Sequence, residues 1–341
     1  MKNLLFAAAT TVAMTFASCD KNSEPLFPVS GGMNGSHVRI TLTEDSGTRA
    51  SSTDTVAAEA WEKSLSSLSI FTFDNTGSLI VRRDFSSEEL AAKSATFSLP
   101  KSVAGTSCSF YAVANFDASA AKTEADLTAL VESAAASYNG TFAEVSTKAL
   151  RPGGFVMSGM KTQNVGAVNS TTDVGISLKR TVAKVVLQTS VDASFAEKYS
   201  GSLTINSVKL SKAASQSLVV AGNTPSTGVM DYTHTQTPAV ASGMCNSLFY
   251  LYENDPHAAD DCILLEIRAS YDMDGNAATA DDTSEVIYPV ELTGSGNGEI
   301  RRNGCYCIEA NITGLVGQDC TVSVSVADWE PPFTQSVELG A

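Results

Sequence analysis

Two residues near the amino end have the type and setting that post-translational chemistry requires. Cys19 directly follows Phe16-Ala17-Ser18, at the end of an apolar, small-residue run that begins at Leu4 behind Lys2. Such a run is too short to span a bilayer and is typical of an export signal. A cysteine at this place is typical of bacterial lipoproteins; the alternative is an ordinary signal with a chance cysteine. We expect a signal peptide over 1–18 and acylation, such as palmitoylation, at Cys19.

Arg49 is a lone basic residue within the small and polar stretch Gly47-Thr48-Arg49-Ala50-Ser51-Ser52. Exposed, flexible stretches of this kind are where proteases cut. Arg39, the preceding arginine, lies inside an expected strand and fits this role poorly. The sequence therefore predicts cleavage between Arg49 and Ala50, which would also release the lipid tether at Cys19.

Two segments at opposite ends of the chain alternate like strands, one from His37 to Thr43 and one from Phe333 to Leu339. Successive side chains of a strand point to opposite faces, so each segment has one apolar face. These faces are formed by Val38, Ile40 and Leu42 in the first and by Phe333, Val337 and Leu339 in the second.

The two segments together predict a way for copies of the chain to polymerise. Cleavage after Arg49 would free the first strand from a folded β-domain and leave an apolar groove. The terminal strand of another copy could fill that groove, in the manner of donor-strand complementation. Pro331 and Pro332 precede the terminal strand and would keep it extended and apart from its own domain. The pattern indicates a secreted fibre subunit.

Composition limits the class of protein and its partners. The 341 residues include 22 Lys plus Arg against 37 Asp plus Glu, a formal charge of -15. The segment up to Arg49 holds four residues of each sign, so the chain from Ala50 onward keeps that charge. A charge of this sign argues against nucleic acid as a partner. The length is comfortable for two domains, and sparse aromatics with abundant small and β-branched residues indicate a mostly β protein.

Strand patterns recur along the whole chain, with turn residues between them. One short helix is expected over Thr123 to Ser133, with Thr123 as its cap and Leu127, Leu130 and Val131 at helical spacing. The expected strands are Leu68–Phe73 and Ser78–Val81 as a hairpin, Ser107–Ala114, Phe155–Gly159, Val174–Leu178, Thr181–Thr189, Ser202–Leu210, Ser247–Tyr252, Cys262–Tyr271, Glu285–Leu292, Cys305–Ile312 and Thr321–Val326. We place a domain boundary near residue 179.

Six cysteines remain once Cys19 is set aside. An even number in an exported chain permits disulfides, but buried free thiols are the alternative. Cys305 and Cys307 lie two apart in an expected strand and point to the same face, which makes a bond between them awkward. The six are Cys108, Cys245, Cys262, Cys305, Cys307 and Cys320.

We expect no metal, no cofactor and no catalysis. The histidines are only His37, His234 and His257, which is a poor supply for a zinc site. The run Asp272-Met-Asp-Gly-Asn276, followed by Asp281 and Asp282, is similar to a calcium loop, but its glycine falls at the fourth place and no glutamate stands at the twelfth. A solvated hairpin loop is favoured there. No Gly-x-Ser-x-Gly elbow is present.

Several of these segments together resemble the fimbrillins of Bacteroidetes, the subunits of protease-assembled (type V) pili. The resemblance spans nearly the whole chain and rests on the order of its motifs. The residues that carry it are Phe155-Val-Met-Ser-Gly159, Leu178-Lys-Arg-Thr-Val-Ala-Lys-Val185, Phe249-Tyr-Leu-Tyr-Glu-Asn254, Arg301-Arg-Asn-Gly-Cys-Tyr-Cys-Ile308 and Val322 to Trp329.

The resemblance implies an all-β fold of two tandem transthyretin-like (Greek-key) β-sandwich domains. It implies a lipoprotein precursor in the outer membrane, a trypsin-like Arg-specific processing protease, and other fimbrial subunits as partners in cell-surface fimbriae. It offers no role for the six cysteines. The expected regions are the signal peptide 1–18, a propeptide 19–49 with the removable strand, domains 50–178 and 179–330, and the donor strand 331–341.

The leading hypothesis is a structural, non-enzymatic fimbrial subunit that supports adhesion. The alternative is a monomeric surface lipoprotein, or a pilus-tip adhesin, that binds host glycan or protein. The tail discriminates between them, because a tip subunit needs no donor strand, whereas this chain continues for eleven residues beyond Glu330.

Overall fold

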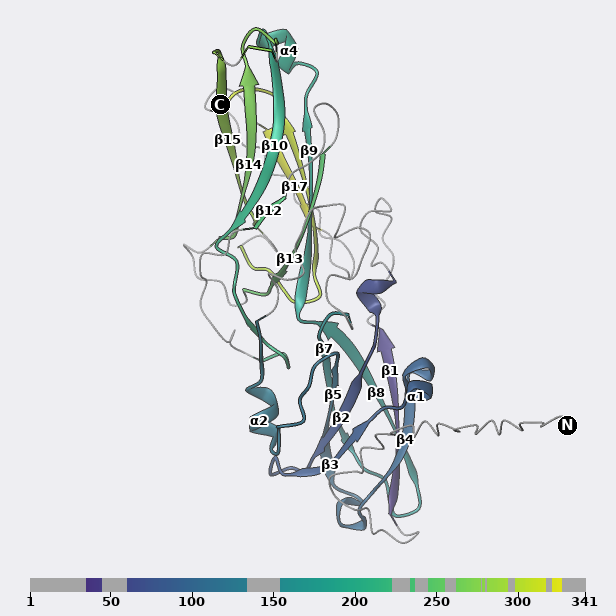
Figure 1. The fold of residues 1–341 in the computed structure, drawn as a ribbon. Helices are drawn as coiled ribbons and strands as arrows, with labels where there is room; N and C mark the ends of the chain where they lie inside the picture. Colours follow the sequence, from purple (N-terminus) through teal and green to yellow (C-terminus); the bar gives the residue numbers. More distant parts are fainter. Residues whose placement is uncertain are drawn as a thin grey trace, which may run out of the picture.

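The structure is a computed structural model that describes ten segments of the chain. They are residues 35–44, 60–133, 154–222, 234–236, 245–254, 262–276, 278–279, 281–293, 298–316 and 321–326. Figure 1 shows two elongated β bodies stacked end to end, with the early strands in one and the late strands in the other. We call them the first and the second sandwich.

The first sandwich is built from one seven-stranded sheet of order β3-β2-β5-β7-β8-β1-β4. The sheet folds on itself where β7 meets β8, because these strands share only the residue pairs Met157 with Arg180 and Ser158 with Lys179. The two halves of the sheet then enclose one apolar core. The strands are β1 Ser36–Glu44, β2 Leu68–Phe73, β3 Leu79–Asp84, β4 Ser94–Leu99, β5 Ser107–Ala114, β7 Met157–Asn164 and β8 Thr171–Arg180.

Short helical segments lie between successive strands along the chain. The predicted helix is confirmed as α2, and Thr123 caps it: its side chain accepts a hydrogen bond from the Asp126 N–H. The helix ends at Thr128, however, and Val131 belongs to the short strand β6, so helical spacing was the wrong period there. The helical segments are η1 Trp61–Lys63, α1 Ser87–Ala92, η2 Lys101–Val103, α2 Glu124–Thr128 and α4 Phe195–Lys198.

The second sandwich packs two four-stranded sheets, of order β12-β10-β14-β15 and β13-β9-β16-β17, face to face. Ile263, Leu265 and Ile267 share one buried face, as their alternation predicts. The strands are β9 Val182–Val191, β10 Ser202–Ser211, β12 His234–Gln236, β13 Cys245–Tyr252, β14 Leu264–Asp272, β15 Thr283–Glu291, β16 Cys305–Ile312 and β17 Thr321–Val326.

A connection crosses between the two bodies. β6 (Val131–Glu132) of the first half pairs with β11 (Ser217–Leu218) of the second half. Val219 and Val220 then pack on the outer face of β2 and β5, beside α2. The second half of the chain therefore supplies part of the core of the first.

The predicted fold class is confirmed, since the described chain is mostly β and forms sandwiches. The sheets change between Arg180, the last residue of β8, and Val182, the first of β9. The division of the chain into two domains at residue 179 stays a prediction, because the segment around Ser217 comes after this residue but packs against the first sandwich. The sequence did not indicate β4, β6, α1 or α4, which are short or lack a clear period.

Candidate strand-exchange site

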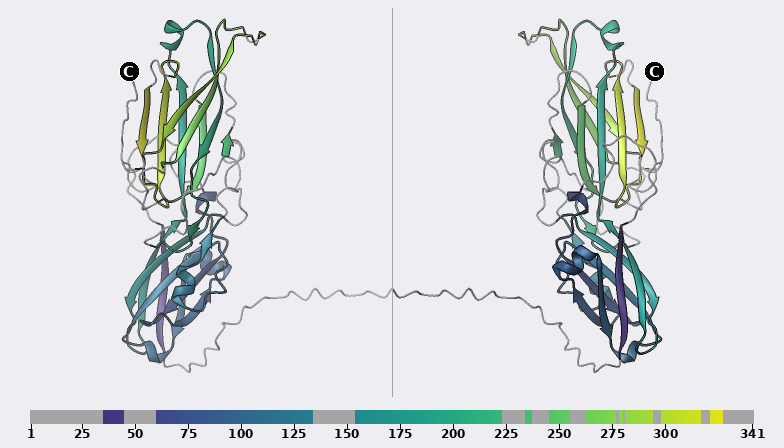
Figure 2. Two further views of the ribbon diagram at one scale, coloured as in Figure 1. Left: turned by 90° about the vertical axis from the view of Figure 1, so that its left-hand side faces the viewer. Right: turned by 90° about the vertical axis from the view of Figure 1, so that its right-hand side faces the viewer.

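β1 occupies an internal position of the first sandwich, between a parallel and an antiparallel neighbour. It forms eight residue pairs with β8 in the parallel sense and six with β4 in the antiparallel sense. Figure 2 shows β1 in purple within the wall of the lower body. Among the described strands, β4 has no other sheet partner. Taking β1 away would therefore open the sheet and leave β4 unpaired.

The inward face of β1 is fully packed. Val38 and Ile40 are 0% exposed and Leu42 is 6% exposed, and all three belong to the core of the first sandwich. Burial of each such side chain stabilises a fold by roughly 1.5 to 3 kcal/mol. An empty β1 position would thus expose a strongly apolar groove.

The groove is polar at the end where β1 begins. Ser36 is 0% exposed, and its Oγ lies 3.0 Å from the carbonyl oxygen of Gly166 and 3.2 Å from that of Ala167. The preceding residue, Gly35, is confined as well, because a Cβ there would lie 2.4 Å from the Leu99 carbonyl oxygen. Ser36 has no distinctive sequence signal, since an isolated serine before an alternating strand has many ordinary roles.

The outward face of β1 makes weaker contacts. The Nδ1 atom of His37 lies 3.0 Å from the Ser98 Oγ on β4. Arg39 forms an ion pair of 3.3 Å with Asp173 on β8, and both side chains are more than half exposed. Exposed ion pairs contribute at most about 1 kcal/mol. Most of the stability of β1 in its place therefore comes from its inward face and its two backbone ladders.

The other site residues predicted from the sequence lie outside the described residues. They are Cys19, Arg49, Ala50, Phe333, Val337 and Leu339. The described chain ends at Glu44 after β1 and resumes at Ala60. Acylation, cleavage and strand donation at these residues stay predictions, as does the displacement of Val38, Ile40 and Leu42.

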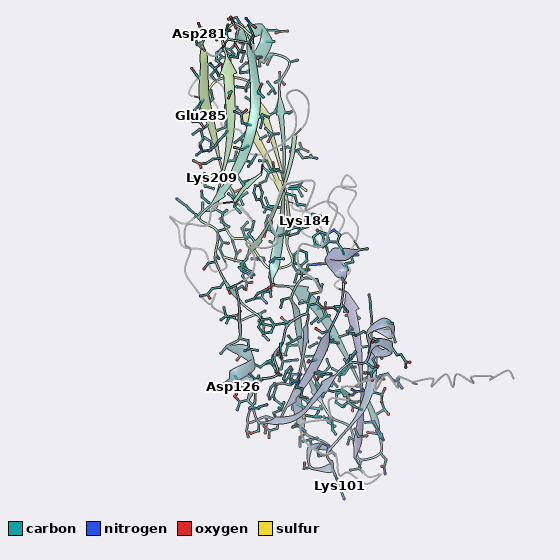
Figure 3. All side chains as sticks on the ribbon, viewed as in Figure 1. Lys101, Asp126, Lys184, Lys209, Asp281 and Glu285 are labelled. Atoms are coloured by element: carbon teal, nitrogen blue, oxygen red, sulfur yellow. The ribbon has the colours of Figure 1, made fainter. Side chains whose placement is uncertain are left out.

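A buried polar cluster joins the two sandwiches just after the chain resumes. The carboxylate of Glu62, 0% exposed, lies 3.0 Å from the Lys184 ammonium, which is 3% exposed, and accepts a hydrogen bond from the Tyr250 hydroxyl. Arg180 donates its Nε–H to the Glu62 carbonyl oxygen at 2.8 Å. Figure 3 places Lys184 between the two bodies. A buried charge is tolerated only when it is paired and hydrogen-bonded, so these groups depend on one another.

Aromatic rings close the same junction. Trp61 lies 5.4 Å from Phe155 and 5.8 Å from Tyr250, measured between ring centroids, and the latter two rings are 4.8 Å apart. Such pairs add to area burial because the ring edges and faces carry opposite partial charge. Tyr250 thus belongs both to this ring cluster and to the hydrogen bond with Glu62.

A second buried polar group lies nearby. The guanidinium of Arg302 donates to the Glu253 carboxylate, with Nε to Oε2 at 2.9 Å, and to the Leu218 carbonyl at 2.8 Å. Arg180 donates to the Asn303 side-chain oxygen at 2.7 Å. It therefore ties the end of β8 to the loop before β16.

Four of the motifs that carried the family resemblance meet at this junction. Each of them supplies one of the contacts just described, although the segments are far apart in the chain. Phe155 comes from the first, Arg180 and Lys184 from the second, Tyr250 and Glu253 from the third, and Arg302 and Asn303 from the fourth. Glu62 was not predicted from the sequence, because a lone acidic residue beside Trp61 has no distinctive sequence signal.

Among the described cysteines, Cys108 and Cys305 are buried, and Cys262 and Cys307 are partly buried. Cys108 is a buried free thiol whose pKa burial raises. Cys305 and Cys307 share one face of β16, as expected, and their thiols hydrogen-bond to each other near Lys184. That hydrogen bond, together with burial, raises the pKa of Cys305. Cys245 and Cys320 offer no described side chain, so the disulfide alternative stays open for them.

The acidic loop lies at the far end of the second sandwich. β14 and β15 form an antiparallel pair, so the predicted hairpin is confirmed. The carboxylates of Asp272, Asp274 and Asp282 lie within 4.8 Å of one another. Burial raises the pKa of Asp272, and the neighbouring acidic side chains add to this effect. Figure 3 labels Asp281 at this end, remote from β1.

No helix within the described segments is long and apolar enough to cross a bilayer.

Solved structures with the same fold include proteins described as cell adhesion proteins and a tip fimbrial protein. A candidate cell adhesion protein from Parabacteroides distasonis has 15% identity and a TM-score of 0.62, over 88% of this chain and 99% of that chain. The tip fimbrial protein Mfa3 from Porphyromonas gingivalis has 14% identity and a TM-score of 0.54, over 86% and 99%. A candidate cell adhesion protein from Bacteroides eggerthii has 19% identity and a TM-score of 0.52, over 83% and 88%. At these identities the likeness shows the fold alone.

Sequence comparison gives the family. No curated protein matches the chain. The family model described as "Fimbrillin-A associated anchor proteins Mfa1 and Mfa2" matches residues 36–333 and so begins at the first residue of β1. That family is one of fimbrial proteins of the cell surface, which associate with other fimbrial subunits, and not one of enzymes. Since the match covers most of its length, the chain belongs to the family of the fimbrillin-A associated anchor proteins Mfa1 and Mfa2.

Proposed function

We propose that this chain is a structural subunit of a cell-surface fimbria that polymerises by protease-triggered donor-strand exchange and supports adhesion. The observation that carries the proposal is the position of β1, a strand at the start of the fold that nevertheless lies inside a sheet. A cut between Arg49 and Ala50 by a trypsin-like, Arg-specific protease would separate this strand from the rest of the sandwich without breaking any described element.

The energetics favour retention before the cut and exchange after it. Within one chain, β1 is held at high effective concentration beside β4 and β8. After cleavage that advantage is lost, and an incoming strand can form backbone hydrogen bonds worth about 0.5 to 1.5 kcal/mol each on both sides. It would also bury the apolar groove. A replacement strand at an internal position is paired on two sides, unlike one that only extends a sheet edge.

The terminal segment 331–341 is our candidate for the incoming strand. Its residues Phe333, Val337 and Leu339 share one face, and the family match ends at residue 333, so the alternating tail lies almost wholly beyond it. A donor strand enters the groove of another subunit, so the partners in this proposal are other fimbrial subunits, in homo- or hetero-polymers. We keep the tail as the donor because an alternating apolar face needs a partner sheet.

The route to the surface follows from the amino end. The precursor would be exported, acylated at Cys19 and held in the outer membrane, where each buried methylene of the lipid adds roughly 0.8 kcal/mol to anchoring. Cleavage at Arg49 would then release both the tether and β1, and the mature form would reside in cell-surface fimbriae.

The family description favours a second candidate, a subunit that keeps its lipid. The family model is that of anchor proteins, and one structural neighbour is a tip fimbrial protein. An anchor subunit would retain Cys19 with its lipid and would keep β1 in place. A tip subunit would bind host glycan or protein at the end of the fibre. A monomeric surface lipoprotein would bind such a ligand without a fibre.

Amino-terminal sequencing of the protein from purified surface filaments separates these candidates. We expect the sequence to begin at Ala50, and we expect Arg49→Ala to leave an uncleaved, membrane-bound monomer. Arg39→Ala is the matched control, since Arg39 is the arginine on the described outer face of β1, and it should be processed normally. Normal filaments from the Arg49 variant would overturn the trigger, and a lipid-bearing Cys19 in native filaments would favour the anchor.

The lipid is tested separately by metabolic labelling with a fatty acid. Cys19→Ala should abolish the label and mislocalise the precursor, because the apolar run before it is removed with the signal. Equal label in the variant and the natural chain would exclude Cys19 as the acceptor.

A further inference from the structure

The β1 position has a chemical pattern along its length, and not only an apolar face. At its beginning, the buried Oγ of Ser36 lies within hydrogen-bonding distance of two backbone carbonyl oxygens, those of Gly166 and Ala167. We call these two oxygens and the space before them the polar notch. The next inward positions, those of Val38 and Ile40, are fully buried among apolar side chains. A strand in this place must therefore offer a hydrogen-bond donor first and aliphatic side chains after it.

We propose that the polar notch sets the register and the direction of the strand that replaces β1, and that Gln335 from the tail of a second copy of this chain fills it. The proposal rests on the proposed function, because it concerns the strand that is exchanged. An aliphatic side chain at the Ser36 position would remove the donor that the Gly166 carbonyl oxygen has in Ser36, which is costly, whereas the Ala167 oxygen would keep its hydrogen bonds from the N–H and the Oγ of Ser170. Gln335 carries two N–H donors on one amide.

The tail matches the pattern in one direction. With Gln335 at the Ser36 position, Val337 falls at Val38 and Leu339 at Ile40, both aliphatic. Ala341, the last residue, then falls at the position of Leu42. Shifting the tail forward by two residues would bury Gln335 at the Val38 position, without a partner on the apolar face.

The start of the groove also limits where the tail can enter. Thr334 would fall at Gly35, where a Cβ would lie 2.4 Å from the Leu99 carbonyl oxygen. The tail must therefore leave the path of β1 before Gln335, which makes Gln335 its first residue in the groove and leaves Val337 and Leu339, but not Phe333, of its apolar face to fill it. Pro331 and Pro332 stand directly upstream and suit a chain that enters from another direction.

The opposite direction fits less well. Running the tail in reverse would place Ala341 at the Ser36 position and Gln335 at that of Leu42, so the notch would face a methyl group. In the favoured direction, Glu338 takes the place of Arg39 beside Asp173. That contact between like charges lies on the exposed face, where solvent screens it.

Cross-linking distinguishes the two directions. Leu42 donates its N–H to the Lys93 carbonyl at 2.9 Å, so the even-numbered residues of β1 form the hydrogen-bonded pairs with β4. His37 and Ser98 are then a non-hydrogen-bonded pair, in which side chains approach most closely. In the proposed register Ser336 replaces His37 and faces Ser98.

The experiment uses filaments of the full chain in which Ser336→Cys is combined with Ser98→Cys. Mild oxidation should give a ladder of covalent oligomers that survives heating without reductant. The matched variant combines Ser336→Cys with Ser94→Cys, which is the facing residue if the tail runs in reverse, and it should give no ladder. The single variants control for the native cysteines.

A cross-link through the Ser94 variant, or no cross-link in either while filaments form, would overturn the register. Absence of filaments from the natural chain would overturn the proposed function itself. A second test avoids cysteines: Gln335→Glu places an acceptor against two carbonyl oxygens and should weaken oligomers about tenfold or more. Gln335→Ser keeps a donor and should assemble nearly normally; equal assembly of both variants would also overturn the proposal.

Discussion

The two sandwiches fill the same kind of sheet position in different ways. In the first, β1 lies parallel to β8 and antiparallel to β4. In the second, β16 lies parallel to β9 and antiparallel to β17. Both strands bury an apolar face, with Ile40 and Ile308 each 0% exposed.

The difference lies in how each strand is joined to the chain. β1 precedes every other described strand and connects forward through the segment 45–59, which contains Arg49. β16 stands between β15 and β17, so one cut on either side would leave it attached to the other neighbour. Position along the chain, and not position in the sheet, decides which strand is removable. This is why we assign exchange to the first sandwich alone.

Deleting the tail should have the largest effect of the changes that test whether β1, and not β16, is exchanged. Deletion of residues 333–341 should preserve secretion, cleavage and thermal stability of the monomer, because β1 already fills its position. The same deletion should remove the whole ladder of oligomers on mild electrophoresis.

A substitution in the tail gives the matched comparison. Val337→Asp with Leu339→Asp should act nearly like the deletion, since two unpaired charges would have to enter an apolar groove. An unchanged ladder in either variant would show that the copies associate through another surface.

Breaking the junction should show how far the two sandwiches depend on each other. Glu62→Gln leaves the Lys184 ammonium buried without its carboxylate, which we expect to cost about 3 to 5 kcal/mol. Calorimetry should then show the sandwiches melting separately at lower temperature. Glu88→Gln, on the exposed face of α1, is the control and should change stability by less than about 0.5 kcal/mol. Equal melting curves for the two variants would contradict a joining role for Glu62.

Matched truncations in β1 and β16 compare the two strands directly. Ile40→Ala and Ile308→Ala should each destabilise the precursor by about 2 to 5 kcal/mol, because each opens a cavity in a core. In assembled oligomers only Ile308→Ala should remain costly, because β1 is no longer present there. Denaturant titration of precursor and oligomer measures both. A loss of oligomer stability with Ile40→Ala would mean that β1 stays in place.

The smallest expected effect concerns acid stability at the tip of the second sandwich. Hydrogen bonds from Ser194 and Asn311 lower the pKa of Asp192 to about 2. A lowered pKa stabilises the fold above the ordinary value of 3.8, and this contribution disappears as the pH falls towards 2. Asp192→Asn should therefore lower the denaturation midpoint at pH 6 and make little difference at pH 2. A constant difference across this range would exclude the carboxylate as its source.

The sequence by itself determined the elements whose signal is local. Alternation predicts β1, strand patterns between turn residues predict β5, β16 and β17, and Thr123 predicts the start of α2, because side-chain period, turn residues and capping depend only on near neighbours. The same alternation selected Val38, Ile40 and Leu42 as the inward face of β1, and all three are buried. The order of short motifs along the chain also indicated the family that the comparison confirms.

Tertiary structure alone decided which strands meet and what stands at the ends of the groove. β1 lies between β8 and β4 because it bonds to residues 133 positions away in β8 and 54 positions away in β4. The notch at Ser36 is made of backbone carbonyls from a distant loop, which carry no residue signature. The charge of Glu62 is acceptable only because folding brings Lys184 and Tyr250 to it. Contacts of this kind depend on the whole chain being packed, and no local period encodes them.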